Sequence, residues 1–425
     1  MSEKIGNRYL VIVGAIIVQL CLGTIYAWTI FQTALRGGTY GWPSLLTQLP
    51  FAAGLASFAL FMIFAGRWQD RVGPRKVATV GGILLGLGYI LASFVDMLAL
   101  DATMGTVYLV ITYGIIGGAG IGFAYVCPIA ALVKWFPDKK GAITGIAVAG
   151  FGGGAFIFLY VEEFFINTLS GGLVGMPFLY LGFIYLAGVV LGSQLLTNPP
   201  QGWMPEGYTP PAKTADASGE GVMPGEMIRT SSFWLLWLMF VFAATAGLMT
   251  LGNVKSAAAL VDPLVNGAPL LQLGALIGGI MSLFNAAGRI VWGATSDKLG
   301  RANTMVLMFL ILALSMFGLA WMSLSTPTEG LWVTVTLFAS LVGFCFGGNF
   351  ALFPSSTADY FGSKHVGKNY GVMFTAYGIA GIVGGLVAGL FVDLTGSYFM
   401  AFMITGVLAI IAVIFTIILK MRRTD

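Results

Sequence analysis

The sequence predicts an all-α membrane protein in which twelve transmembrane helices form two six-helix halves related by pseudo-two-fold symmetry. Three observations lead to this fold class: the composition, twelve long apolar runs, and a repeat between the two halves of the chain. Hydrophobic residues make up 58% of the 425 residues and charged residues only 9%, with a mean hydropathy of +0.90. A soluble domain carries about 25% charged residues. This chain therefore lacks the polar residues needed to cover a water-exposed surface.

Each apolar run is long enough to cross a bilayer, because about 20 apolar residues span about 30 Å of hydrocarbon. The first run follows a positively charged start but continues past Trp28 without a small-residue cleavage site, so we interpret it as a span and not a signal peptide. We expect spans at 9–35, 46–66, 77–98, 106–133, 142–165, 177–197, 233–254, 271–292, 303–324, 331–353, 370–392 and 397–420.

The distribution of basic residues predicts the orientation. With both termini in the cytoplasm, every Lys and Arg falls on the cytoplasmic side except Arg36, Lys255 and Arg289. This asymmetry follows the positive-inside rule. The net charge of +4 therefore reflects orientation in the lipid bilayer and indicates no nucleic-acid partner. We expect a multi-pass protein of the bacterial inner (plasma) membrane that functions as a monomer.

A polar stretch divides the chain into the two halves. Residues 198–231 are rich in Pro, Gly, Ser and charge, which is typical of a linker between 1–197 and 232–425. The loop after the second span reads GRWQDRVGPRK, and the loop after the eighth reads GATSDKLGR. Asp70 and Asp297 occupy equivalent positions in these loops. Two parallel six-helix repeats are one of the known architectures of secondary transporters.

The repeated loop, G-x-x-x-D-[RK]-x-G, resembles the signature of the major facilitator superfamily. The resemblance implies that Asp70, Arg71, Asp297 and Lys298 belong to a cytoplasmic clasp that changes between outward-open and inward-open states. Within this superfamily, five blocks resemble the oxalate:formate antiporter and monocarboxylate transporter family. They are WFPDKKGAITG (135–145), GEMIRTSSFWLLW (225–237), FNAAGRIVWGATSDKLGR (284–301), ALFPSSTADYFG (351–362) and KNYG (368–371).

Arg289 is a permanent charge inside the eighth predicted span. Insertion of such a residue costs about 2.5–3.5 kcal/mol, so it must face the interior of the bundle and find a partner. No Asp or Glu lies in the middle of a predicted span; Glu162 and Glu163 fall near the outer end of the fifth. A guanidinium pairs well with a carboxylate. We therefore predict that Arg289 binds a substrate anion, the alternative being a structural arginine that donates to backbone carbonyls.

Three positions of this chain differ from those that the resemblance implies for its relatives. Asn285 lies one helical turn before it and can hydrogen-bond the bound carboxylate. The resemblance implies an Asp at that position in animal monocarboxylate transporters, and a Lys where this chain has Ile30. Relatives that transport oxalate carry a second cation where this chain has Tyr377. A single cation matches one carboxylate, since a dianion would bury an unpaired charge.

Aromatic residues are expected to line the rest of the site. The resemblance places Tyr26, Trp28, Tyr125, Phe346 and Phe350 at cavity positions of the oxalate branch. Asn349 lies between the last two, and the hydroxyls of Tyr26, Tyr125 and Tyr377 suit a hydroxy acid such as lactate. The alternative for each aromatic residue is ordinary packing in the bundle.

We predict a secondary active transporter of lactate-like or pyruvate-like monocarboxylates that works by alternating access with proton symport. The alternatives are anion exchange of the oxalate:formate type and, from a different class, a sensor with little transport. An enzyme is not expected, because the sequence has no triad, metal cluster or phosphate loop. We also expect no cofactor and no bound metal. Cys21, Cys127 and Cys345 read as buried small residues, and His365 as a solvated loop residue.

Overall fold

A computed structural model of the chain describes residues 8–37, 39–136, 140–200, 203–205, 221–261, 270–362 and 365–424. The described residues are almost entirely helical and contain no strand. Eleven helical segments within them are long and apolar enough to cross a membrane. Helix α16 (Thr375–Thr395) occupies the position of the remaining expected span. The prediction of an all-helical, twelve-span membrane fold is confirmed.

The N-terminal half contains six spans. The first is α1 (Arg8–Leu22), η1 (Gly23–Ala27) and α2 (Thr29–Arg36), followed by α3 (Ser44–Val72) and α4 (Pro74–Ala92), which η2 (Ser93–Val95) extends. The fourth is α5 (Ala102–Leu109), η3 (Val110–Gly117) and α6 (Gly118–Trp135). The fifth is α7 (Lys140–Phe164) with η4 (Phe165–Leu169), and the sixth is α8 (Gly175–Gln194).

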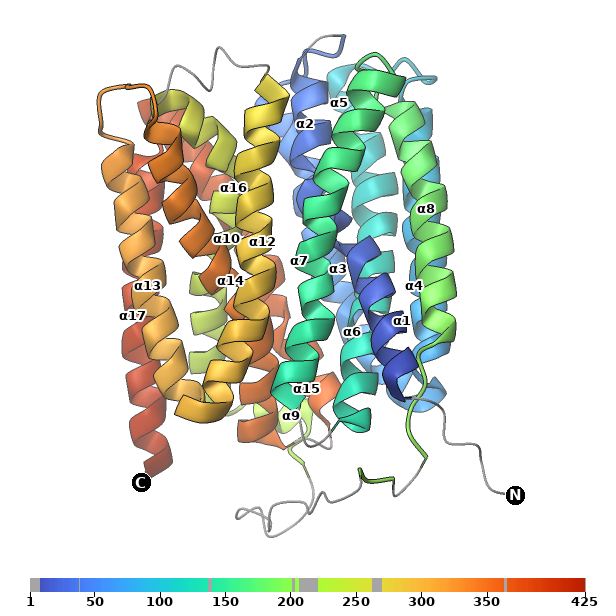
Figure 1. Ribbon diagram of the computed structural model, residues 1–425, viewed down its shortest axis with the longest axis vertical. Helices are drawn as coiled ribbons and strands as arrows, with labels where there is room; N and C mark the ends of the chain where they lie inside the picture. The colour runs from blue at the N-terminus through green and yellow to red at the C-terminus, as the bar shows by residue number, and fades with distance from the viewer. Residues whose placement is uncertain are drawn as a thin grey trace.

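The C-terminal half begins with the short helix α9 (Pro224–Met227). Its spans are α10 (Ser231–Val261), α12 (Leu270–Leu299), α13 (Arg301–Met322), α14 (Leu331–Phe361), α16 preceded by α15 (Val366–Met373), and α17 (Phe399–Thr424). In Figure 1 the long helices α10, α12, α13, α14, α16 and α17 lie on one side of the bundle and α1–α8 on the other. The domain limits 1–197 and 232–425 stay a prediction, and half of the expected linker lies outside the described residues.

Glycine explains why the repeated loop has the same spacing in both halves. Gly73 lies between α3 and α4 with φ +87°, and Gly300 lies between α12 and α13 with φ +81°. An L-residue with a side chain rarely adopts this conformation. Each loop can therefore reverse the chain within a single residue, and Pro74 at the first position of α4 has the φ that a helix start requires.

The two halves meet along two seams, α7 against α12 and α3 against α16. Figure 1 shows α7 and α12 side by side at the centre of the bundle. The backbones approach closely because glycines face the partner helix. A Cβ on Gly145 would lie 3.0 Å from the Arg289 carbonyl oxygen, and one on Gly152 would lie 3.0 Å from the Ala286 nitrogen. Small residues allow this close helix packing within a membrane.

Candidate functional site

Arg289 lies on α12 at the seam between the halves, and its side chain is 0% exposed. Its Nε donates to the Asn285 side-chain oxygen at 3.2 Å, and its NH1 nitrogen donates to the Val148 carbonyl of α7 at 2.7 Å. Its NH2 nitrogen has no hydrogen-bond partner among the described residues. The guanidinium is therefore anchored on two sides and presents unused donors on the third.

The charge of Arg289 lacks an acidic partner in the described part of the chain. The ion pairs found there join Arg301 to Asp297 and to Asp359, and neither involves Arg289. The expected alternative, bonding to backbone carbonyls, accounts for only one of its nitrogens. An unpaired N–H buried in a low-dielectric site costs about 1–3 kcal/mol, and more when it is charged. The arrangement therefore favours an external anion as the missing partner.

Close packing of α12 against α14 positions the guanidinium. A Cβ on Gly288 would lie 2.0 Å from the Phe344 carbonyl oxygen, and one on Gly347 would lie 2.0 Å from the Asn285 carbonyl oxygen. Helices α12 and α14 are thus in backbone contact directly beside Arg289. Asn285 is held by its own amide, which donates to the Gly343 carbonyl of α14 at 3.3 Å. This bond orients the Asn285 oxygen toward the Arg289 Nε.

Aromatic rings cover the guanidinium. Its central carbon lies 4.3 Å from the centre of the Phe350 ring and 5.3 Å from that of Phe151. Both distances are within the range of cation–π attraction. Phe350 was expected at the site, whereas Phe151 on α7 was not. The signal for Phe151 was a single aromatic residue inside the glycine run GFGGG (150–154).

A hydrogen bond between tyrosines joins the two halves beside Arg289. The hydroxyls of Tyr26 in η1 and Tyr377 in α16 are 2.8 Å apart. The Tyr26 ring packs against Phe151 at 5.1 Å and against Phe346 at 6.0 Å between centroids. The Arg289 guanidinium lies close enough to the phenol oxygens of Tyr26 and Tyr125 to interact with both. The structure thus brings Tyr26, Tyr377 and Phe346 together as expected.

Other expected residues have unmet hydrogen-bonding capacity or different roles. The Tyr125 hydroxyl and both polar side-chain atoms of Asn349 are buried without a partner among the described residues. The Tyr125 ring packs edge-on against Phe151 at 5.5 Å, which places it at the aromatic site. No hydrogen bond found among the described residues joins Asn349 to Arg289. Trp28 instead donates its indole N–H to the Thr47 carbonyl at 3.0 Å and is a packing residue of the first half.

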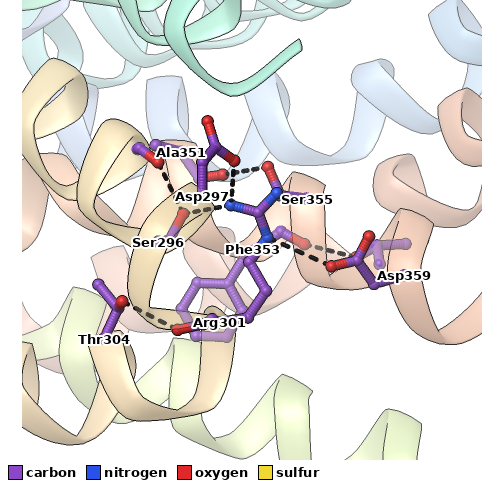
Figure 2. A network of polar contacts seen from close by, with 11 residues as sticks. Ser296, Asp297, Arg301, Thr304, Ala351, Phe353, Ser355 and Asp359 are labelled. Carbon is purple, nitrogen blue, oxygen red and sulfur yellow. Dashed lines mark hydrogen bonds and ion pairs between the residues drawn. The ribbon is translucent and has the colours of Figure 1, made fainter. Parts of the chain in front are cut away.

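The second copy of the repeated loop forms a polar network, shown in Figure 2. Arg301 pairs with Asp297 at 2.8 Å and with Asp359 at 3.2 Å, and it also bonds to the Ser296 hydroxyl. Sequence reasoning missed Arg301, although it stands directly after the motif glycine. Lys298 is exposed and forms no ion pair in the described part of the chain.

The first copy faces the opposite half. A Cβ on Gly367 of α15 would lie 3.7 Å from the Asp70 carboxylate oxygens, and Lys134 and Lys368 are near enough to stabilise the Asp70 charge. His365 also lies near enough to Asp70 for an electrostatic interaction, so this loop residue belongs to the same cluster. Arg71 is exposed, and no ion pair involving it is found among the residues described.

Comparisons with known proteins agree with this architecture. Residues 9–339 and 265–425 match the Major Facilitator Superfamily. The chain is 29% identical to the oxalate:formate antiporter of Oxalobacter formigenes over 413 residues, which cover 96% of this chain and 90% of the relative. It is 26% identical to monocarboxylate transporter 12 of Rattus norvegicus over 370 residues, covering 81% of this chain and 72% of the relative.

The fold also resembles that of a solved transporter. The xylose transporter XylE from E. coli, in a partially occluded inward-open conformation, superposes with a TM-score of 0.69 at 14% sequence identity. The similarity covers 96% of this chain and 98% of XylE. The resemblance that the sequence motifs carry is therefore confirmed, and the family and the relatives are transporters, not enzymes. The chain belongs to the Major Facilitator Superfamily and is a multi-pass membrane transporter.

Proposed function

We propose that this protein is a secondary active transporter of small monocarboxylates of the lactate or pyruvate kind, and that Arg289 pairs with the substrate carboxylate. The observation that carries the proposal is a fully buried guanidinium whose NH2 nitrogen has no partner in the described structure. A carboxylate accepts two parallel N–H bonds from a guanidinium. The names of the oxalate:formate and monocarboxylate relatives support a small carboxylate as the substrate.

The charge at the site supports one carboxylate per substrate. Tyr377 stands where oxalate-transporting relatives are expected to carry a second cation, and its hydroxyl is bonded to Tyr26. A dianion would keep one charge without a partner in a low-dielectric environment, which is costly. The aromatic surfaces of Phe151 and Phe350 suit the short apolar end of such an acid, and the phenols suit a hydroxyl or keto group.

The position of Arg289 at the contact between the halves supports alternating access about the anion site. Binding of an anion neutralises the guanidinium and lowers the cost of rocking the halves about the site. We propose that both termini face the cytoplasm, that the protein lies in the plasma membrane, and that it works as a monomer. Moving one negative charge into a negative interior costs about 2.3 kcal/mol per 100 mV, so accumulation requires compensation. Proton symport supplies this compensation.

Anion exchange is the second candidate, because the Oxalobacter formigenes relative is named as an antiporter. Uptake of labelled L-lactate into proteoliposomes separates the two mechanisms. Symport predicts uptake that an inward proton gradient drives and an uncoupler abolishes. Exchange predicts uptake that requires lactate or formate inside the vesicle and is insensitive to the gradient.

The same assay tests Arg289. We expect Arg289→Gln to lose uptake and binding, because the substituted amide has no charge to offer the anion. Arg8→Gln is a matched control, since Arg8 also stacks on a ring, with its guanidinium 4.9 Å from the centre of Phe136, but lies at the start of α1. Normal lactate uptake by Arg289→Gln would refute the assignment of the anion site.

A further inference from the structure

Glu162 is a buried carboxyl that the anion site does not use. It lies on α7, and its side chain is 0% exposed. Its Oε1 accepts a hydrogen bond from the Thr24 hydroxyl at 2.9 Å, while Oε2 has no partner among the described residues. Sequence reasoning placed Glu162 near the outer end of its span and gave it no role. The structure encloses it in the first half.

The groups around Glu162 are hydroxyls and not cations. The Thr24 oxygen also lies 2.6 Å from the Tyr185 hydroxyl of α8 and 3.1 Å from the Tyr89 hydroxyl of α4. Tyr113 of η3 packs edge-on against Tyr89, and its own hydroxyl is unpaired among the described residues. The Cys21 thiol of α1 neighbours Tyr185.

No ion pair involves Glu162 in the described part of the chain. Arg289 is a cation at the contact between α7 and α12, and it bonds to Val148 of α7. Val148 precedes Glu162 by fourteen positions, which is about 21 Å along the helix at 1.5 Å per residue. An isolated carboxylate is costly to bury unless it is paired, so such groups become neutral or mark proton pathways. Glu162 therefore has the surroundings expected of a group that binds and releases a proton.

The hydroxyl cluster can serve both charge states of Glu162. A hydroxyl has one proton to donate and two lone pairs to accept. When Glu162 is ionised, Tyr89 and Tyr185 donate to Thr24, and Thr24 donates to Oε1. When Glu162 is protonated, it can donate to Thr24, whose own proton then turns toward a tyrosine. Loss or gain of one proton thus reverses the direction of hydrogen bonding through Thr24.

Thr24 connects this cluster to the anion site through the backbone. Thr24 and Tyr26 both lie in η1, a 3₁₀ segment between α1 and α2 in the middle of the first span. A 3₁₀ stretch inside a helix often marks a functional hinge. A Cβ on Gly23 would lie 2.0 Å from the Phe151 carbonyl oxygen, so η1 rests directly on α7 beside the aromatic site. Because Tyr26 is only two positions after Thr24 in η1, a change in hydrogen bonding at Thr24 can move the Tyr26 hydroxyl that bonds to Tyr377.

We propose that Glu162 is the proton-binding site that couples proton movement to anion transport, acting on the anion site through η1; this inference rests on the proposed function. One proton binds the Glu162 carboxylate from the outer side, and one monocarboxylate binds at Arg289. After the halves rock, both leave on the inner side, so no net charge crosses the membrane. Asn285 cannot take this role, because an amide does not titrate.

Glu162→Gln tests the proposal in proteoliposomes, because the amide imitates the neutral carboxyl and cannot release a proton. Exchange of labelled external lactate against unlabelled internal lactate moves no net proton, and we expect the variant to keep it. We expect its proton-driven accumulation to fall by about tenfold or more, within the usual range of coupling between sites. Glu163→Gln, which changes the adjacent carboxyl, is the matched control and should keep both activities.

The two assays separate failure of this inference from failure of the proposed function. If the unsubstituted protein neither exchanges nor accumulates lactate, or only exchanges it, both the symport function and the role of Glu162 are refuted. If it accumulates lactate with protons and Glu162→Gln does the same, only the role of Glu162 is refuted. Accumulation lost with exchange retained in Glu162→Gln, but not in Glu163→Gln, supports it.

A second variant covers the case in which Glu162→Gln does not fold. Thr24→Val is nearly isosteric and leaves the carboxyl in place without its hydroxyl donor. Because that donor stabilises the ionised form, its removal favours the protonated form, and the pH optimum of lactate uptake should shift toward alkaline pH. An unchanged pH profile in a folded, transporting Thr24→Val protein would overturn the proposal.

Discussion

Replacing Asn285 by Asp would give Arg289 a permanent partner inside the protein. The Asn285 oxygen is already 3.2 Å from the Arg289 Nε, so the substituted carboxylate needs no rearrangement to form an ion pair. At that distance, and with an effective dielectric constant of about 20, the attraction is about 5 kcal/mol. Part of it is offset by the cost of burying the new charge. A net loss of about 3 kcal/mol in anion binding corresponds to a roughly 100-fold rise in Kd.

The measurement is L-lactate binding to purified Asn285→Asp protein by calorimetry, at pH 7.5 and at pH 5. Protonation of the introduced carboxyl removes its charge, so we expect affinity to recover on acidification, whereas the unsubstituted protein should show no comparable recovery. Asn253→Asp is the matched control, because Asn253 bonds to the Met249 carbonyl and to Tyr398, away from Arg289. Unchanged affinity at pH 7.5 in Asn285→Asp would refute the predicted competition between a carboxylate at position 285 and the substrate anion for Arg289.

Three further predictions concern the surroundings of the site. Tyr26→Phe removes the 2.8 Å bond between the halves, so it should destabilise the arrangement seen in the structure by about 1 kcal/mol and increase the reactivity of a cysteine probe placed at the site. Unchanged reactivity would show that this bond does not hold the halves together. Gly23→Ala would place a Cβ 2.0 Å from the Phe151 carbonyl and should lower the thermal unfolding temperature and lactate transport. Gly385→Ala is the control, because Gly385 has open space around it, and it should lower neither the unfolding temperature nor lactate transport. Equal effects of the two substitutions would contradict the close contact of η1 with α7. Arg301→Gln breaks two half-exposed ion pairs, each worth about 0–1 kcal/mol, so it should lower the unfolding free energy by less than about 2 kcal/mol and leave lactate Kd unchanged.

The sequence predicted the bundle well because span length, apolar continuity and the repeated loop depend on local chemistry. Arg289 stood out for the same reason, as a charge in an apolar run. Its position relative to Asn285 also followed from helical spacing, and the structure confirms their contact. These inferences require one helix at a time, so they do not depend on how helices pack.

Contacts between helices were harder to foresee. The Val148 carbonyl and the Phe151 ring reach Arg289 only because α7 and α12 approach through glycines, and a carbonyl leaves no signature in a sequence. Glu162 was judged by its distance from the end of the apolar run, which says nothing about which face of α7 is buried. The break at η1 was also missed, since its residues, GTIYA, continue the apolar pattern.

The two copies of the repeated loop have different surroundings in the structure. Asp70 faces α15, an element of the opposite half, so its environment must change whenever the halves rotate against each other. Asp297, Arg301 and Asp359 all belong to the second half, so their ion pairs move together as a unit. Substitutions at Asp70 should therefore alter the rates of rotation, whereas those around Arg301 alter rigidity. We therefore propose that the first copy connects the two halves, whereas the second stabilises one half.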